Sequence, residues 1–159
     1  MTLLTSIQDI SDNKEGYMNM KQVCRKLMQE HTEIALATSV GGQPHVRIVN
    51  FFYDPDVKVI FFTTFSDNAK VQEFRVNDRV AFTTFPREGN AHVRGVGRIQ
   101  ESARPLGDVA YGFVERIPGY KDTLDQAGEF LKLYEIHFQE VHVTVDFENS
   151  GVVVRGDID

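Results

Sequence analysis

Two basic residues, Arg47 and Lys70, have the types and positions that most clearly suggest a binding site. Arg47 lies inside a strand-like run, residues 44–53, and Lys70 follows residues 66–68, a polar segment that can begin a helix. The free N–H groups and the dipole at a helix N-terminus favour an anion, whereas a lysine in the first turn is unfavourable without one. The pattern therefore indicates a phosphate site. Taken alone, this signal is weak, and an arginine that faces solvent or pairs with an acid is the simpler interpretation.

The remaining chemistry-bearing residues form no recognisable catalytic or metal-binding pattern. No metal-ligand spacing links the five histidines, which are His31, His45, His92, His137 and His142. The single cysteine, Cys24, falls on an apolar helical stripe and is expected to be a small buried hydrophobe rather than a reactive thiol. Gly95 and Gly97 lie in mid-strand with no helix after them, so they are not a dinucleotide-binding fingerprint. We instead expect close packing of another segment at these glycines.

The elements that must position the two cations are mainly strands. Alternating apolar and polar residues and turn signals predict strands at residues 33–40, 44–53, 57–64, 79–85, 91–101, 136–147 and 151–155. Apolar spacing predicts helices after Asn19, over residues 67–76, and along stripes that begin at Leu106 and Leu124. Short antiparallel connections favour a closed or partly closed barrel, because closure removes strand edges. The fold class is thus mainly β with flanking helices, a six- to seven-stranded antiparallel barrel.

Length and composition indicate one domain, residues 1–159, with residues 1–16 loosely ordered. The net charge of −6 disfavours nucleic-acid binding, which usually requires a basic face. One cysteine excludes an intramolecular disulfide, which fits a cytoplasmic protein. The first residues do not form a signal peptide, and no run approaches the roughly 20 apolar residues of a membrane span.

Three segments in order resemble a known family. They read A-L-A-T-S-V-G-G-Q-P-H-V-R-I-V-N-F-F, then V-I-F-F-T-T-F-S-D-N-A-K-V-Q-E-F-R-V-N-D-R-V-A-F, then H-V-R-G-V-G-R-I, within residues 34–101. Their order and spacing resemble the pyridoxamine 5′-phosphate oxidase-like family, the FMN-binding split β-barrels. The resemblance implies a homodimer with an FMN in each of two clefts between subunits.

The resemblance also implies a set of cofactor-binding residues. The strand that contains the arginine would line the flavin, the end of the next strand would contact ring and phosphate, and the helix start would bind the phosphate. A residue on a later strand would reach the flavin of the other subunit. The corresponding residues of this chain are Arg47, Ile48, Val49, Asn50, Phe62, Thr63, Thr64, Asn68, Lys70 and His92. His92 stands where the oxidases have a glutamine, and Ala69 precedes Lys70 where they have a basic residue.

The C-terminus, F-E-N-S-G-V-V-V-R-G-D-I-D, lacks the R-x-H motif with which true pyridoxamine phosphate oxidases hold their substrate. The resemblance therefore implies a flavin- or nitroreductase-like FMN oxidoreductase, in which a reduced donor such as NAD(P)H supplies electrons for a small acceptor and the flavin carries the chemistry. One alternative is a non-catalytic module that binds a flavin, the deazaflavin F420 or haem. Another is a structural or regulatory dimer with an empty cleft.

Overall fold

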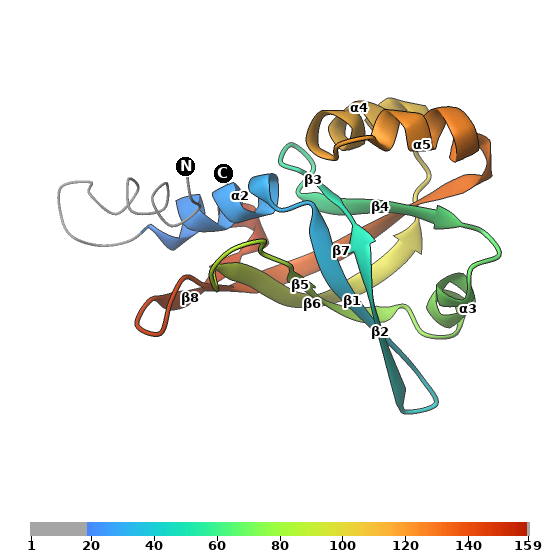
Figure 1. Ribbon diagram of the computed structural model, residues 1–159. Coiled ribbons are helices and arrows are strands. Elements are labelled where there is room, and N and C mark those ends of the chain that lie inside the picture. The colour runs from blue at the N-terminus through green and yellow to red at the C-terminus, as the bar shows by residue number, and fades with distance from the viewer. Residues whose placement is uncertain (1–18, 159) are drawn as a thin grey trace.

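A computed structural model describes residues 19–158, and the prediction that residues 1–16 are loosely ordered lies outside this range. One antiparallel sheet of eight strands curls into a half-barrel with helices around it (Figure 1). The strands are β1 (Glu33–Val40), β2 (Gln43–Asn50), β3 (Phe52–Asp54), β4 (Val59–Phe65), β5 (Arg79–Thr84), β6 (His92–Glu101), β7 (Leu131–Thr144) and β8 (Ser150–Val154). The α-helices are α2 (Met20–Glu30), α3 (Ala69–Val76), α4 (Leu106–Arg116) and α5 (Tyr120–Ala127), and two 3-10 turns complete the order. The predicted split-barrel fold is confirmed.

One predicted strand, residues 44–53, is two strands in the structure. Phe51 separates them: its side chain is fully buried, and its backbone N–H donates to the carbonyl of Thr32. β2 pairs with β1, whereas β3 pairs with β4. The strand order is β2-β1-β5-β6-β7-β4-β3, so two segments that are consecutive in the chain lie at opposite ends of the sheet. Because the sheet curls, these edges approach each other, and β2 lies beside β4 without pairing to it.

The long strands β6 and β7 pair with each other along most of β6, and this pairing depends on small residues. The register shifts between Gly95 and Gly97. A Cβ atom at Gly97 would lie 2.4 Å from the carbonyl oxygen of His137, which is far inside van der Waals contact. The prediction that a segment packs closely at these glycines is therefore confirmed.

α2 packs its apolar stripe against the barrel core. The side chain of Asn19 caps this helix by accepting from the N–H of Lys21 at 3.1 Å, as its position predicts. Cys24 is completely buried on the stripe, and burial raises the pKa of its thiol to about 12. A thiol that stays protonated is a poor nucleophile, so Cys24 is a packing residue as expected.

α4 and α5 cover the outer surface of β3 and β4 and build a second, smaller core (Figure 1). Phe52 of β3 packs against Gly112 of α4 so closely that a Cβ there would lie 2.3 Å from its ring. The rings of Phe113 and Tyr120 stack at a centroid distance of 4.9 Å. The helices therefore immobilise the β3–β4 edge, from which the chain continues into α3.

Candidate functional site

The start of α3 is held in the geometry that the sequence predicts. Asn68 is the N-cap residue, with an extended backbone, and its side chain accepts from the N–H of Lys70 at 3.2 Å. Lys70 is half-buried, and its Nζ donates to Oγ1 of Thr64 at 2.9 Å. Thr64 is buried at the end of β4. One strand end and one helix start thus fix the ammonium group of Lys70.

Arg47 lies on β2 and reaches across β1 toward α3. Its Nη1 donates to Oγ1 of Thr38 at 2.8 Å and to the carbonyl of Leu36 at 3.3 Å, and its Nη2 donates to Oε2 of Glu73 at 2.5 Å. The side chain of Arg47 is 22% exposed and that of Glu73 is 15% exposed. The pairing with an acid that the sequence left open is therefore present. A guanidinium has five N–H groups, so Arg47 retains donors for a further ligand.

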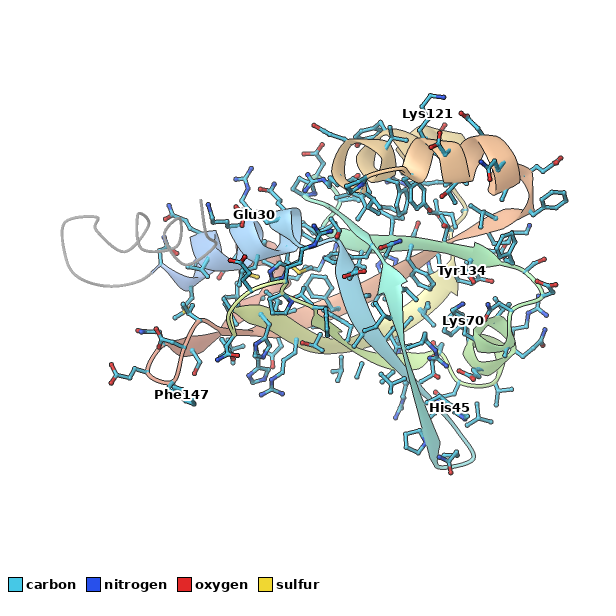
Figure 2. The ribbon with its side chains drawn as sticks, in the orientation of Figure 1. Glu30, His45, Lys70, Lys121, Tyr134 and Phe147 are labelled. Atoms are coloured by element: carbon cyan, nitrogen blue, oxygen red, sulfur yellow. The ribbon has the colours of Figure 1, made fainter. Side chains whose placement is uncertain are left out.

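Glu73, Thr38 and His45 contact one another or Arg47 at this site, and they were not predicted from the sequence. Thr38 donates its hydroxyl to Oε2 of Glu73 at 2.5 Å, and Nδ1 of His45 lies 3.8 Å from Oε1. Figure 2 shows His45 on the β1–β2 hairpin and Lys70 on α3 at the same side of the barrel. A signal existed for Glu73, which follows Lys70 by three residues and therefore shares its helix face. No such signal existed for Thr38 and His45, because their positions depend on the pairing register of β1 and β2.

The electrostatics show that Arg47 and Lys70 act on one another. Burial lowers the pKa of Lys70, and the positive charge of Arg47 lowers it further, whereas Glu73 partly compensates. Burial alone would raise the pKa of Glu73, but the hydrogen bonds from Thr38 and Arg47 and the charge of Arg47 outweigh it, so this pKa is lowered. The cluster is thus two cations and one carboxylate. The destabilised charge of Lys70 favours binding of an anion.

The other residues predicted for the flavin are divided between two surfaces and the core. Ile48 is 50% exposed on the outer face of β2 with Asn50, whereas Val49 packs against the core. Phe62 is fully buried between Phe74 and Tyr134, so its side chain is a core residue. Of the predicted set, the structure brings together Arg47, Thr64, Asn68 and Lys70.

Thr63 and His92 lie apart from this cluster. The hydroxyl of Thr63 is hydrogen-bonded to that of Tyr120 at the start of α5. His92 begins β6, where its Nδ1 lies 2.5 Å from the carbonyl of Asn90. β6 is the third strand from β2, which corresponds to about 14 Å across the sheet. Within one chain His92 therefore cannot complete the site around Arg47.

The outer face of β2, β1, β5 and β6 is apolar and exposed. Val46 and Val96 are 70% and 72% exposed, and small side chains lie between them on β1 and β5. An open groove crosses this face and is lined by Ala37, Ala81, Val96, Arg98, His137 and Glu140 among others. Such a face, with charged residues at its rim, has the character of a protein–protein interface.

The described part of the chain contains neither a candidate metal site nor a helix that could span a membrane. Among residues 19–158, no three side chains of His, Cys, Asp or Glu are grouped so that they could hold a metal ion. No helix in the same range is long and apolar enough to cross a membrane.

The family assignment follows from a comparison with protein-family models. Residues 27–150 match the model described as pyridoxamine 5′-phosphate oxidase-like, and the chain belongs to this family. No curated protein sequence matches the chain.

Solved structures with the same fold have low sequence identity and diverse names. A haem-binding protein from Mycobacterium smegmatis superposes with a TM-score of 0.72 at 11% identity, over 88% of this chain and 60% of its own. General stress protein 26 from Bacillus anthracis superposes with a TM-score of 0.67 at 13% sequence identity, over 86% of this chain and 99% of its own. An FAD-binding protein from Mesorhizobium loti superposes with a TM-score of 0.56 at 18% sequence identity, over 74% of this chain and 88% of its own. The chain thus spans only about three fifths of the first relative's length, and at these identities the likeness shows the fold alone.

Proposed function

We propose that the chain is an FMN-binding oxidoreductase of the flavin- or nitroreductase type. The observation that carries this proposal is the approach of Arg47, on β2, to α3, whose capped start holds Lys70, so that the two cations act on one another. Helix N-terminal N–H groups and two basic side chains are the donors that a phosphate monoester requires. Asn68 and Thr64, which already orient Lys70, complete the phosphate end of the site.

In this proposal the flavin extends from the phosphate site along β2. When bound, FMN supplies the redox chemistry, and the protein supplies binding and orientation. Backbone groups of β2 from Arg47 to Asn50 would face the ring. Thr63 would need to exchange its bond to Tyr120 to reach the ligand. An NAD(P)H-type donor and a small acceptor such as a nitro compound or a quinone complete the proposed reaction.

We also propose that the functional unit is a homodimer. Support comes from the apolar outer face, on which Val46, Ile48 and Val96 are at least half-exposed. A second copy on this face would cover these side chains, and it would allow His92 of one chain to approach the β2 strand of the other. The site around Arg47 is open to such a contribution because β2 is an edge strand.

The proposal is tested by flavin binding. The purified protein is expected to be yellow or to take up added FMN, with bands that bleach on addition of NAD(P)H. Arg47→Ala and Lys70→Ala should each weaken FMN binding by roughly ten- to hundredfold, because a hydrogen bond to a charged group contributes about 1.5–3 kcal/mol. The matched control is Lys121→Ala, which removes an exposed lysine of α5. A protein that takes up no FMN, or full FMN binding by both site variants, would contradict the phosphate site.

A second candidate function is binding without turnover, since two structural neighbours are named for haem binding and FAD binding. Their names favour a module that binds a cofactor. Visible spectra separate the two functions: flavin bands that no reduced nicotinamide bleaches, or an intense haem band after reconstitution, would support the binding module.

A further inference from the structure

Glu73 places a negative charge within the proposed phosphate site. We propose that this carboxylate is a built-in competitor for the ligand phosphate, so that FMN is a dissociable ligand of this chain rather than a permanently held one. The inference rests on the proposed function, because it concerns how firmly the same site holds the phosphate.

The competition follows from the hydrogen bonds of Arg47. Its donors to Leu36 and Thr38 have neutral acceptors, whereas Glu73 is its charged acceptor, at 2.5 Å. Thr38 holds the same carboxylate oxygen at 2.5 Å, so Glu73 is anchored by two groups and is only 15% exposed. A phosphate that approaches Arg47 therefore approaches a fixed carboxylate as well.

The charge balance shows the consequence. Arg47 and Lys70 supply two positive charges and Glu73 removes one, whereas a phosphate monoester carries nearly two negative charges at pH 7. Lys70 does not compensate Glu73 by a direct bond, because its Nζ donates to Thr64 instead. A unit charge about 5 Å from a dianion changes a binding constant by roughly tenfold even at the dielectric constant of water.

A glutamine at this position separates competition from a merely orienting role. Gln retains an acceptor for Arg47 and Thr38 but removes the charge. If Glu73 competes, Glu73→Gln binds FMN about tenfold more tightly. If Glu73 only holds Arg47 in place, the same substitution leaves FMN binding unchanged or weakens it.

The experiment titrates the full chain with FMN and with riboflavin, which lacks the phosphate, and follows flavin fluorescence. For Glu73→Gln we expect about a tenfold lower Kd for FMN, an unchanged Kd for riboflavin, and FMN that now remains bound through gel filtration. The wild-type protein should lose FMN on the same column. The control Glu115→Gln removes an exposed carboxylate of α4 and should change neither affinity. Glu73→Ala, which also removes the charge, gives a second measurement if the glutamine variant fails to fold.

The outcomes separate this inference from the proposed function. If the wild-type protein binds FMN more tightly than riboflavin but Glu73→Gln gives no gain, the competitor role is wrong and the phosphate site stands. A wild-type protein that retains stoichiometric FMN on the column also overturns the inference. If the wild-type protein binds neither flavin, both proposals fail.

Discussion

Arg47 and Lys70 are expected to differ in what they contribute to stability, although both should contribute to flavin binding. The structure ties Arg47 to three groups on β1 and α3, whereas Lys70 makes one side-chain hydrogen bond, to Thr64. Substitution by methionine keeps most of the aliphatic stem and removes the charge in each case. Arg47→Met should therefore destabilise the fold, and Lys70→Met should not.

The expected magnitude follows from the lost contacts. Hydrogen bonds contribute about 1 kcal/mol each, and one between charged groups about 2 kcal/mol. Arg47→Met loses two bonds to neutral acceptors and one to Glu73, which amounts to roughly 4 kcal/mol. Part of this loss arises because Glu73 remains in a largely buried position without its cation. Lys70→Met loses about 1 kcal/mol, which is offset because burial and Arg47 already disfavour the charge of Lys70. In a protein of this size, these values correspond to melting temperatures about 8–16 °C lower for Arg47→Met and within about 3 °C of wild type for Lys70→Met.

Thermal unfolding followed by circular dichroism at pH 7, without added flavin, measures the difference. Both variants should also be titrated with FMN, since each should lose affinity. Equal melting temperatures for the two variants, or an Arg47→Met protein as stable as wild type, would show that the Arg47–Glu73 pair does not hold α3 on β1. Arg47 would then not be held beside α3 by Glu73.

Two further predictions concern other parts of the chain. His31 is 5% exposed, neither ring nitrogen has a partner among residues 19–158, and its pKa is lowered by burial, with Glu30 opposing and His92 adding to the shift. The folded state disfavours protonation of His31, so this residue should not reduce the free energy of unfolding above pH 6.5, the ordinary pKa of histidine. Below pH 6.5 the free energy of unfolding should decrease as the pH falls. The melting temperature of His31→Phe should therefore vary less between pH 8 and pH 5 than that of the wild-type protein. On the outer face, Val96→Glu should convert the proposed dimer to monomer in size-exclusion chromatography with light scattering. The control Val114→Glu, on α4, should remain a dimer. If the Val96→Glu variant also remains a dimer, this face is not the interface.

The fold could be predicted from the sequence because its signals are local. Alternation predicted the strands, Asn19 predicted the start of α2, and Gly97 predicted close packing. The break at Phe51 could not be predicted, since phenylalanine is a strand-forming residue and the break depends on the partner strands. Strand pairing is non-local, and the same ten residues pair with β1 at one end and β4 at the other.

The candidate site was predictable to the extent that it depends on a helix cap and on cations. Asn68 and Lys70 lie as predicted, because capping is decided within a few residues. The acceptors of Arg47 were not predictable, because they lie on β1 and at Glu73 in the middle of α3. Phe62 was predicted to support the ring, but alternation along β4 directs its side chain to the core and that of Thr63 to α5. Apolar residues at a strand end indicate burial more directly than ligand contact.

The change of edge at Phe51 also explains why the cations meet where they do. Arg47 belongs to β2, at one end of the strand order, and Lys70 follows β4, beside β3 at the other end. The two side chains become neighbours only when the sheet has curled enough to bring these edges together. Two cations and a partly buried acid at that seam form a charge cluster whose balance depends on barrel closure. A phosphate bound by both cations would therefore contact both edges at once, and binding energy gained there would stabilise the closed barrel by linkage. In this chain the split of the barrel and the proposed phosphate site would then be the same structural feature.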